Sequence, residues 1–342
     1  MIPAGRALLA IGAWLLTAGC WLSAMDSTEQ LTPQAAAAVK KAVAWLAKNQ
    51  KPDGGSGNSS GITGACAIAL MSQGHLPGTG EYGVQTAKAI NFILDTAQPD
   101  GLLYQQWMSG HGPMYHHGLA TLALGEAWGQ TGDKRTRETL RKAIDLICAC
   151  QNQKGGWRYQ PKISDDDLSV TVMQLMALRA ARDAGMDVPK EVIDAGIEYV
   201  KSCHNPKGQG KDGGFGYMPG GGSGFSRSAA GVTSLQVAGD YRASEVVEGI
   251  EYLMTFKPMT EKEIDEHRYY GLYYAAMGLY QAQSLGAQGK KWWSAWYPLV
   301  VRDLLERQQP EGNWKAHFGD YDTAMAILIL TIPYRYLPIY QR

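Results

Sequence analysis

The chain contains two kinds of apolar segment that alternate along its length. Segments of the first kind carry apolar residues at positions i, i+3, i+4 and i+7, which predicts helices that bury one stripe. Four such stripes are Val39, Ala42, Val43 and Leu46; Leu140, Ala143, Ile144 and Ile147; Val246, Gly249, Ile250 and Leu253; and Tyr297, Val300, Val301 and Leu304. Thr32 and Pro33 open the first helix as a cap residue followed by proline at the first helical position.

Segments of the second kind are more apolar and richer in small residues. They cover residues 64–71, 118–128, 170–181, 231–237, 271–281 and 323–330. A helix that is apolar nearly all round is enclosed by other elements on all sides. The alternation therefore predicts helical hairpins, each with one partly exposed and one enclosed helix.

Glycine-rich breaks separate the two helices of a hairpin. They recur at Gly54, Gly101, Gly155, Gly213 and Gly312, at intervals of roughly fifty residues, the last interval being about two periods. The break missing from that interval falls near residues 256–262, where the loop carries Pro258. Six hairpins predict an all-α fold, an α/α toroid in which an inner ring of parallel helices lies inside an outer antiparallel ring. An open solenoid is the alternative arrangement.

Composition limits the classes of partner and metal site. Lys and Arg together number 32, as do Asp and Glu, and no stretch is strongly basic, so nucleic acid is not an expected partner. The chain has 41 Gly and 10 Trp against 5 Phe, and the glycines lie in short clusters between apolar segments. No Cys-x-x-Cys pair occurs, which disfavours a structural zinc site.

The first residues resemble an export signal. Arg6 precedes the apolar run 7–16, and three small residues follow before Cys20. Thr-Ala-Gly-Cys is similar to a bacterial lipoprotein cleavage site, which would make Cys20 a lipid anchor, whereas ordinary secretion and an uncleaved anchor remain alternatives. We expect residues 1–24 to be a signal or lipoprotein signal, residues 31–342 to form the toroid, and the protein to be exported to the cell envelope or periplasm.

Two segments carry a resemblance to a known family. Gln151-x-x-x-Gly155-x-Trp157 and Gln308-x-x-x-Gly312-x-Trp314 match the Gln-Trp repeat of squalene–hopene cyclases and other terpenoid cyclases, and Gln50-x-x-x-Gly54 is a degenerate copy. The chain thus resembles the prenyltransferase and squalene oxidase repeat family, whose fold is the α/α toroid. In that family the motif is structural. A Gln amide at the end of an outer helix can bond backbone groups at the turn, and the Trp can cover the next hairpin.

The same resemblance draws attention to the acidic run Asp165, Asp166 and Asp167. Terpenoid cyclases that begin by protonating an alkene use an Asp-x-Asp-Asp motif, and by that match Asp166 would be the acid and Asp167 its neighbour. Ser164 occupies the first Asp position of the motif, and those cyclases place their cavity between two toroidal domains. The alternative is that the run caps a helix and complements its dipole.

Polar residues just before the enclosed helices should meet at one mouth of a central cavity. Those expected to line it are His116, His117, Arg227, His267, Tyr270, Asp320 and Asp322. No metal or cofactor is predicted. A divalent ion on Asp320, Asp322 and His317 is chemically allowed, but a capped helix beside a surface histidine explains the same residues. Aromatic residues concentrated around 269–274 predict an aromatic wall.

Three functions are compatible with these features. The first is a cavity that binds or transforms an isoprenoid-like lipid, as the resemblance implies. The second is a non-catalytic envelope scaffold that binds a partner protein. The third is a carbohydrate-active toroid, an analogy at the level of the fold. The expected partner is accordingly an apolar small molecule or an envelope protein.

Overall fold

The computed structural model describes residues 31–108, 112–208, 210–256 and 267–334. Residues 1–24 with Cys20, and the predicted break around Pro258, lie outside this part. The outer helices are α1 (Pro33–Asn49), α3 (Gly83–Asp95), α5 (Lys134–Cys150), α7 (Lys190–Ser202), α9 (Ser244–Leu253) and α12 (Ala287–Arg307). The inner helices are α2 (Ser60–Met71), α4 (Pro113–Thr131), α6 (Leu168–Asp183), α8 (Phe225–Val237), α11 (Arg268–Ala282) and α13 (Asp320–Thr331).

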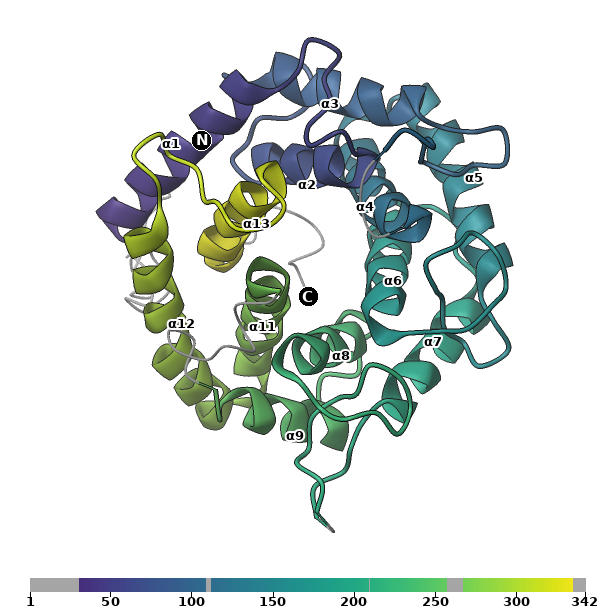
Figure 1. Cartoon of the computed structure of the whole chain (residues 1–342), viewed down its shortest axis with the longest axis vertical. Coiled ribbons are helices and arrows are strands. Elements are labelled where there is room, and N and C mark those ends of the chain that lie inside the picture. Colours follow the sequence, from purple (N-terminus) through teal and green to yellow (C-terminus); the bar gives the residue numbers. More distant parts are fainter. Residues whose placement is uncertain (1–30, 109–111, 209, 257–266, 335–342) are drawn as a thin grey trace, which may run out of the picture.

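The helices form two concentric rings (Figure 1). Each inner helix packs against the next in the order α2, α4, α6, α8, α11 and α13, and α13 packs against α2. In the outer ring α12 contacts α1. The predicted α/α toroid is therefore confirmed, and the open solenoid is excluded because the last hairpin contacts the first.

Small residues let the inner helices approach each other closely. A Cβ atom added to Gly64 of α2 would lie 2.8 Å from the carbonyl oxygen of Leu119 in α4. One added to Gly118 of α4 would lie 2.9 Å from Cβ of Met173 in α6. Any larger side chain would push these backbones apart, which accounts for the small residues of the second kind of segment.

The outer helices bury one stripe each, as their periodicity predicts. In α5 the residues Leu140, Ala143, Ile144 and Ile147 are all fully buried, whereas the residues between them on the other face are largely exposed. Asp133 is the N-cap residue of α5, and its carboxylate accepts a hydrogen bond from the backbone N–H of Thr136. The helix thus has a capped start and a single apolar face.

A glutamine ties the end of an outer helix to the next outer helix. Nε2 of Gln151, which caps α5, donates to the carbonyl oxygens of Gly155 at 2.9 Å and of Val192 in α7 at 2.8 Å. Gly155 has φ of +90°, and a Cβ there would lie 2.0 Å from the Ala195 carbonyl oxygen. Nε1 of Trp157 donates to the Ile147 carbonyl oxygen at 2.7 Å. Glycine is needed for both the turn and the close approach.

The same arrangement closes the ring. Nε2 of Gln308, at the end of α12, donates at 2.8 Å to the Gly312 carbonyl oxygen and at 2.8 Å to that of Ala38 in α1. The backbone N–H of Leu31 donates to the Tyr334 hydroxyl at 2.8 Å, so the two ends of the described chain meet. The seam between the last and first hairpins is bonded like the joints within the ring.

Two further findings concern membrane-spanning helices and cysteines. Among the described helices, none has both the length and the hydropathy that crossing a bilayer requires. The cysteines in the described ranges, Cys66, Cys148, Cys150 and Cys203, are all unpaired.

Candidate functional site

A pocket lies between the N-terminal ends of α11 and α13. It is small and partly open: its cavity volume is about 10 Å³, which is room for about one water molecule, and the empty space around it, open solvent included, is about 230 Å³. Its lining is formed by His267, Arg268, Tyr269, Tyr270, Ala316, His317, Phe318, Tyr321 and Asp322. Three residues predicted to share a cavity mouth, His267, Tyr270 and Asp322, are therefore neighbours here, and we call this space the mouth pocket.

Asp320 and Asp322 face different neighbours. Oδ2 of Asp322 is buried and accepts hydrogen bonds from the backbone N–H groups of Ala316 at 2.9 Å and Phe318 at 3.0 Å. Oδ2 of Asp320 accepts from the N–H of Gly57, before α2, at 3.1 Å. Burial raises the pKa of both carboxyls, and their backbone hydrogen bonds oppose that shift. Asp320 therefore does not line the mouth pocket.

No metal site is supported in the described ranges. No group of three or more His, Cys, Asp or Glu side chains lies close enough there to hold an ion. The two carboxylates that could have joined His317 bind separate backbone donors. Residues 316–319 form a turn that Asp322 holds to the start of α13.

The three aspartates of the acidic run have different surroundings. Asp165 is exposed, whereas the side chain of Asp166 is buried and faces the turn after α5. Its Oδ2 accepts a hydrogen bond from Nδ2 of Asn152 at 2.6 Å and lies 3.5 Å from Nζ of Lys154. This geometry gives Asp166 a role in fixing a loop and provides no contact with the mouth pocket.

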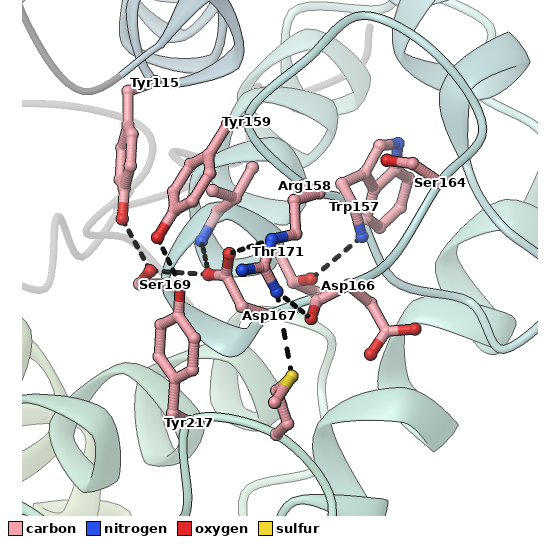
Figure 2. Close-up of polar contacts among 12 residues, drawn as sticks. Tyr115, Trp157, Arg158, Tyr159, Ser164, Asp166, Asp167, Ser169, Thr171 and Tyr217 are labelled. Atoms are coloured by element: carbon pink, nitrogen blue, oxygen red, sulfur yellow. Dashed lines mark hydrogen bonds and ion pairs between the residues drawn. The ribbon is translucent and has the colours of Figure 1, made fainter.

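Asp167 caps the inner helix α6 and is fully buried (Figure 2). Its Oδ1 accepts from the backbone N–H of Val170 at 2.9 Å and from Oγ of Ser169 at 2.6 Å. Its Oδ2 has no hydrogen bond and lies 3.9 Å from Nε of Arg158. The helix-capping alternative is thus realised by Asp167.

Tyrosines surround this carboxylate (Figure 2). The hydroxyl of Tyr115 in α4 lies 2.5 Å from Oγ of Ser169, and the hydroxyls of Tyr159 and Tyr217 are in contact. The Arg158 guanidinium lies over the rings of Tyr159 and Tyr217, at 5.1 Å and 5.8 Å from their centroids. Such stacking fixes the cation beside Asp167.

More tyrosines lie at the centre of the ring. The hydroxyl of Tyr274 in α11 donates to Sδ of Met173 in α6 at 3.2 Å, although these helices are separated by α8. Side chains therefore reach across the ring at this level. The rings of Tyr270 and Tyr274 meet edge to face at 4.8 Å. We call Tyr115, Tyr159, Tyr217, Tyr270, Tyr274 and Tyr321 the tyrosine cluster.

Tyr270 connects the mouth pocket to the cluster. Its hydroxyl is buried and has no hydrogen-bond partner. Burial raises the pKa of Tyr270 well above its ordinary value, and the charges of Tyr274, Tyr115, Tyr321 and Asp167 raise it further. Tyr270 thus lines the mouth pocket and also packs against Tyr274 of the cluster.

The structure corrects the prediction for His117. Its Nδ1 accepts from the backbone N–H of Leu103 and its Nε2 bonds the Ala143 carbonyl oxygen in α5, both at 3.1 Å. The ring is completely buried, and burial lowers its pKa to about 4. His117 therefore faces the outer ring and lines no cavity.

The hydrogen bond that His117 accepts from a backbone N–H has counterparts in other hairpins. The same backbone position donates to a hydroxyl in each of four other hairpins: Ser56 to Thr63, Trp157 to Thr171, Phe215 to Ser228 and Trp314 to Thr323. His117 occupies the position of these Thr and Ser residues. Its role is structural and belongs to the repeat.

His116 and Arg227 are engaged locally. Nδ1 of His116 lies 2.7 Å from Oγ of Ser59, the cap of α2. The guanidinium of Arg227 donates to the Ser223 carbonyl oxygen at 3.1 Å. Neither side chain lines the mouth pocket.

Sequence reasoning missed Arg158, Tyr159, Ser169, Tyr217 and Tyr321. A signal for two of them is present in the repeat. Tyr159 and Tyr217 each stand two residues after the aromatic position of the glycine break, occupied by Trp157 and Phe215. Aligning the breaks would have brought these two tyrosines together.

Curated relatives match parts of the chain. A squalene–hopene cyclase from Bradyrhizobium diazoefficiens is 24% identical over 157 residues, covering 43% of this chain and 22% of that protein. A lanosterol synthase from Saccharomyces cerevisiae is 32% identical over 131 residues, covering 36% of this chain and 17% of that protein. The matched part is thus about a fifth of the length of these relatives.

Solved structures share the fold at low sequence identity. An α-1,6-mannanase from Salegentibacter superposes with a TM-score of 0.65 at 7% identity, over 87% of this chain and 98% of that one. A type II terpene cyclase from Scytonema gives 0.56 at 14% identity, over 90% and 100%. The profile of the prenyltransferase α/α toroid domain matches residues 9–292. The chain therefore belongs to the prenyltransferase α/α toroid family.

Proposed function

We propose that this toroid binds a small, largely apolar, isoprenoid-like molecule at the mouth pocket. The observation that carries the proposal is that Tyr270 lines a pocket with aromatic walls and that its hydroxyl is buried without a hydrogen-bond partner. A buried polar group left unsatisfied costs about 1–3 kcal/mol, so a ligand that pairs with it recovers that free energy. Relatives named squalene–hopene cyclase and lanosterol synthase favour an isoprenoid-like ligand.

We further propose that the acidic run does not protonate this ligand. An acid that protonates an alkene must hold a proton and face the substrate. Asp166 instead accepts from Asn152 beside Lys154, and Asp167 accepts from Ser169 and Val170. Both carboxylates serve as hydrogen-bond acceptors. The proposal is thus binding without cyclisation by this pair.

The carbohydrate alternative has support from several similar structures, among them a mannanase, an unsaturated glucuronyl hydrolase and a cellobiose 2-epimerase. The similar mannanase structure is an inactive variant in which two consecutive aspartates are replaced, bound to α-1,6-mannotriose. Asp166 and Asp167 are also consecutive, but Asp166 faces the turn after α5 whereas Asp167 caps α6. This divergence favours the isoprenoid-like ligand.

A binding experiment with the full chain tests the proposal. We expect radiolabelled farnesol to bind with saturation, and Ala316→Trp, which places an indole in the mouth pocket, to weaken binding at least tenfold. Lys315→Trp is the matched control, because Lys315 is exposed and does not line the pocket. Absence of saturable binding by the wild type would reject the proposal. Recovery of cyclised products after incubation with farnesol would reject the binding-only role. Binding of mannotriose in place of farnesol would favour the carbohydrate alternative.

A further inference from the structure

The mouth pocket is much smaller than its proposed ligand. Its cavity volume of about 10 Å³ is room for about one water molecule. Sites that hold a drug-sized ligand measure roughly 300–1,000 Å³. An isoprenoid-like ligand can therefore enter only if one wall of the pocket moves.

The walls of the pocket differ in how firmly they are held. Most of the lining belongs to the first residues of α11 and α13, two inner helices that pack against each other. The remaining wall is the turn 316–319, which contributes Ala316, His317 and Phe318. All four residues of this turn are exposed. The turn can therefore move while the inner helices stay packed.

Two fixed points lie on either side of this turn. Trp314 before it is fully buried, and its Nε1 donates to the Leu304 carbonyl oxygen in α12 at 2.7 Å. Asp320 after it accepts a hydrogen bond from the backbone N–H of Gly57 at 3.1 Å. Motion is thus confined to the short exposed segment between these two residues.

Gly319 provides a pivot where the turn meets α13. Its φ is +60° and its ψ is −110°, a backbone conformation that residues with a Cβ atom rarely adopt. A Cβ atom built on Gly319 would meet no atom within 4 Å. The backbone conformation therefore requires glycine here, and the space around it leaves room for rotation.

Asp322 holds the turn against the start of α13. Its buried carboxylate lines the mouth pocket. One atom, Oδ2, accepts hydrogen bonds from the backbone N–H groups of Ala316 at 2.9 Å and Phe318 at 3.0 Å. The Phe318 ring also lies edge-on to the Tyr321 ring, with centroids 6.0 Å apart. Because both hydrogen bonds end at one oxygen atom, they should break together when the turn moves.

We infer that the turn 316–319 is a lid over the mouth pocket, which pivots at Gly319 to admit the ligand and is held closed by Asp322. The identity of the ligand rests on the proposed function, whereas the motion of the lid is a property of the chain itself. When the lid lifts, its three lining side chains leave the pocket together. The polar end of a ligand can then reach the Tyr270 hydroxyl.

Residue-resolved hydrogen–deuterium exchange measures the lid without any ligand. Opening breaks both bonds to Asp322, so the amides of Ala316 and Phe318 should show closely similar protection. In Gly319→Ala the new Cβ strains the closed conformation, and we expect both amides to exchange at least fivefold faster. The variant changes no side chain that lines the pocket.

Gly286→Ala is the matched control for this backbone change. Gly286 immediately precedes α12, has φ of +85° and ψ of −143°, and would also meet no atom within 4 Å of a Cβ. We expect this variant to leave the exchange of the Ala316 and Phe318 amides as it is in the wild type. An equal gain in both variants would overturn the assignment of the pivot to Gly319.

The rate of farnesol association tests whether the lid controls entry. We expect radiolabelled farnesol to associate at least fivefold faster with Gly319→Ala than with the wild type, because more of the chain is open. Asp322→Asn removes the charge that strengthens both hydrogen bonds, and should raise the rate at least threefold. Asp320→Asn is its matched control, because Asp320 lies at the same helix start and does not line the pocket. Its rate should equal that of the wild type.

The two measurements separate failure of the lid from failure of the proposed function. Unchanged exchange in Gly319→Ala would overturn the lid. Faster exchange with unchanged farnesol association would also overturn the inference, since the ligand would then enter elsewhere. Faster exchange without saturable farnesol binding by any variant or by the wild type would reject the proposed function and confirm the motion of the lid.

Discussion

Gln308 offers the sharpest test of ring closure. Its amide makes two hydrogen bonds of 2.8 Å, one within its own turn and one across the seam to Ala38. Each bond contributes about 1 kcal/mol net, and removal leaves two carbonyl oxygens without that donor. We therefore expect Gln308→Ala to lower the free energy of unfolding by about 2 kcal/mol. For a chain of this size the melting temperature should fall by about 3 °C.

The chain provides matched controls for this experiment. Gln151 makes the corresponding bonds, of 2.9 Å and 2.8 Å, between helices joined within the ring. Gln309 is exposed and bonds only its own helix end. Urea unfolding followed by circular dichroism should give similar losses for Gln308→Ala and Gln151→Ala and less than about 0.5 kcal/mol for Gln309→Ala. A loss for Gln151→Ala without one for Gln308→Ala would refute closure of the seam in solution.

Two further predictions concern pH and the N-terminus. Burial lowers the pKa of His117 to about 4 from an ordinary value near 6.5. As the pH falls, the unfolded chain therefore takes up this proton before the folded chain does. The stabilisation that is present above pH 6.5 should be lost towards pH 4, by up to about 3 kcal/mol in the free energy of unfolding. Urea midpoints at pH 7 and pH 4.5 measure this, and His117→Gln should reduce the dependence; an equal dependence in both proteins would contradict the assignment. We also propose that Cys20 is lipidated, so Cys20→Ser should abolish incorporation of labelled palmitate and release the protein from the membrane fraction, whereas an unchanged membrane fraction would contradict the anchor.

The fold was largely predictable because it follows from local patterns. The stripe in 140–147 specified an outer helix, and the small residues of 118–128 specified an enclosed one. Regular glycine breaks such as Gly155 indicated equal hairpins. Closure required only that enough similar hairpins curve in the same direction. These features depend on burial and periodicity, which a single sequence records directly.

The site was predictable only in part. His267, Tyr270 and Asp322 were expected together because they precede enclosed helices, and they do line one pocket. At the start of a helix, a shift of one position along the sequence changes which way a side chain points. For this reason His117 was predicted to line the cavity, whereas it points towards the outer ring. Its neighbour Leu103 lies in a loop whose path the sequence does not reveal.

The Asp167 network shows a second limit. Its partners Arg158, Tyr159 and Tyr217 come from two loops that are almost sixty residues apart in sequence, as the contact between Tyr159 and Tyr217 shows. Their meeting depends on the rotation of one hairpin relative to the next. That rotation is set by helix packing and by the glutamine bonds, which are properties of the assembled ring.

The hydrogen bond between Leu31 and Tyr334 has a consequence for how this molecule could be rebuilt. Since the described ends meet at a joint like any other, the order of hairpins around the circle does not depend on where synthesis starts. A linker joining those ends, with new termini at the exposed loop around Gly78, would give a circular permutant with the same neighbours for every helix. The position of any attached anchor could then be moved around the rim independently of the pocket.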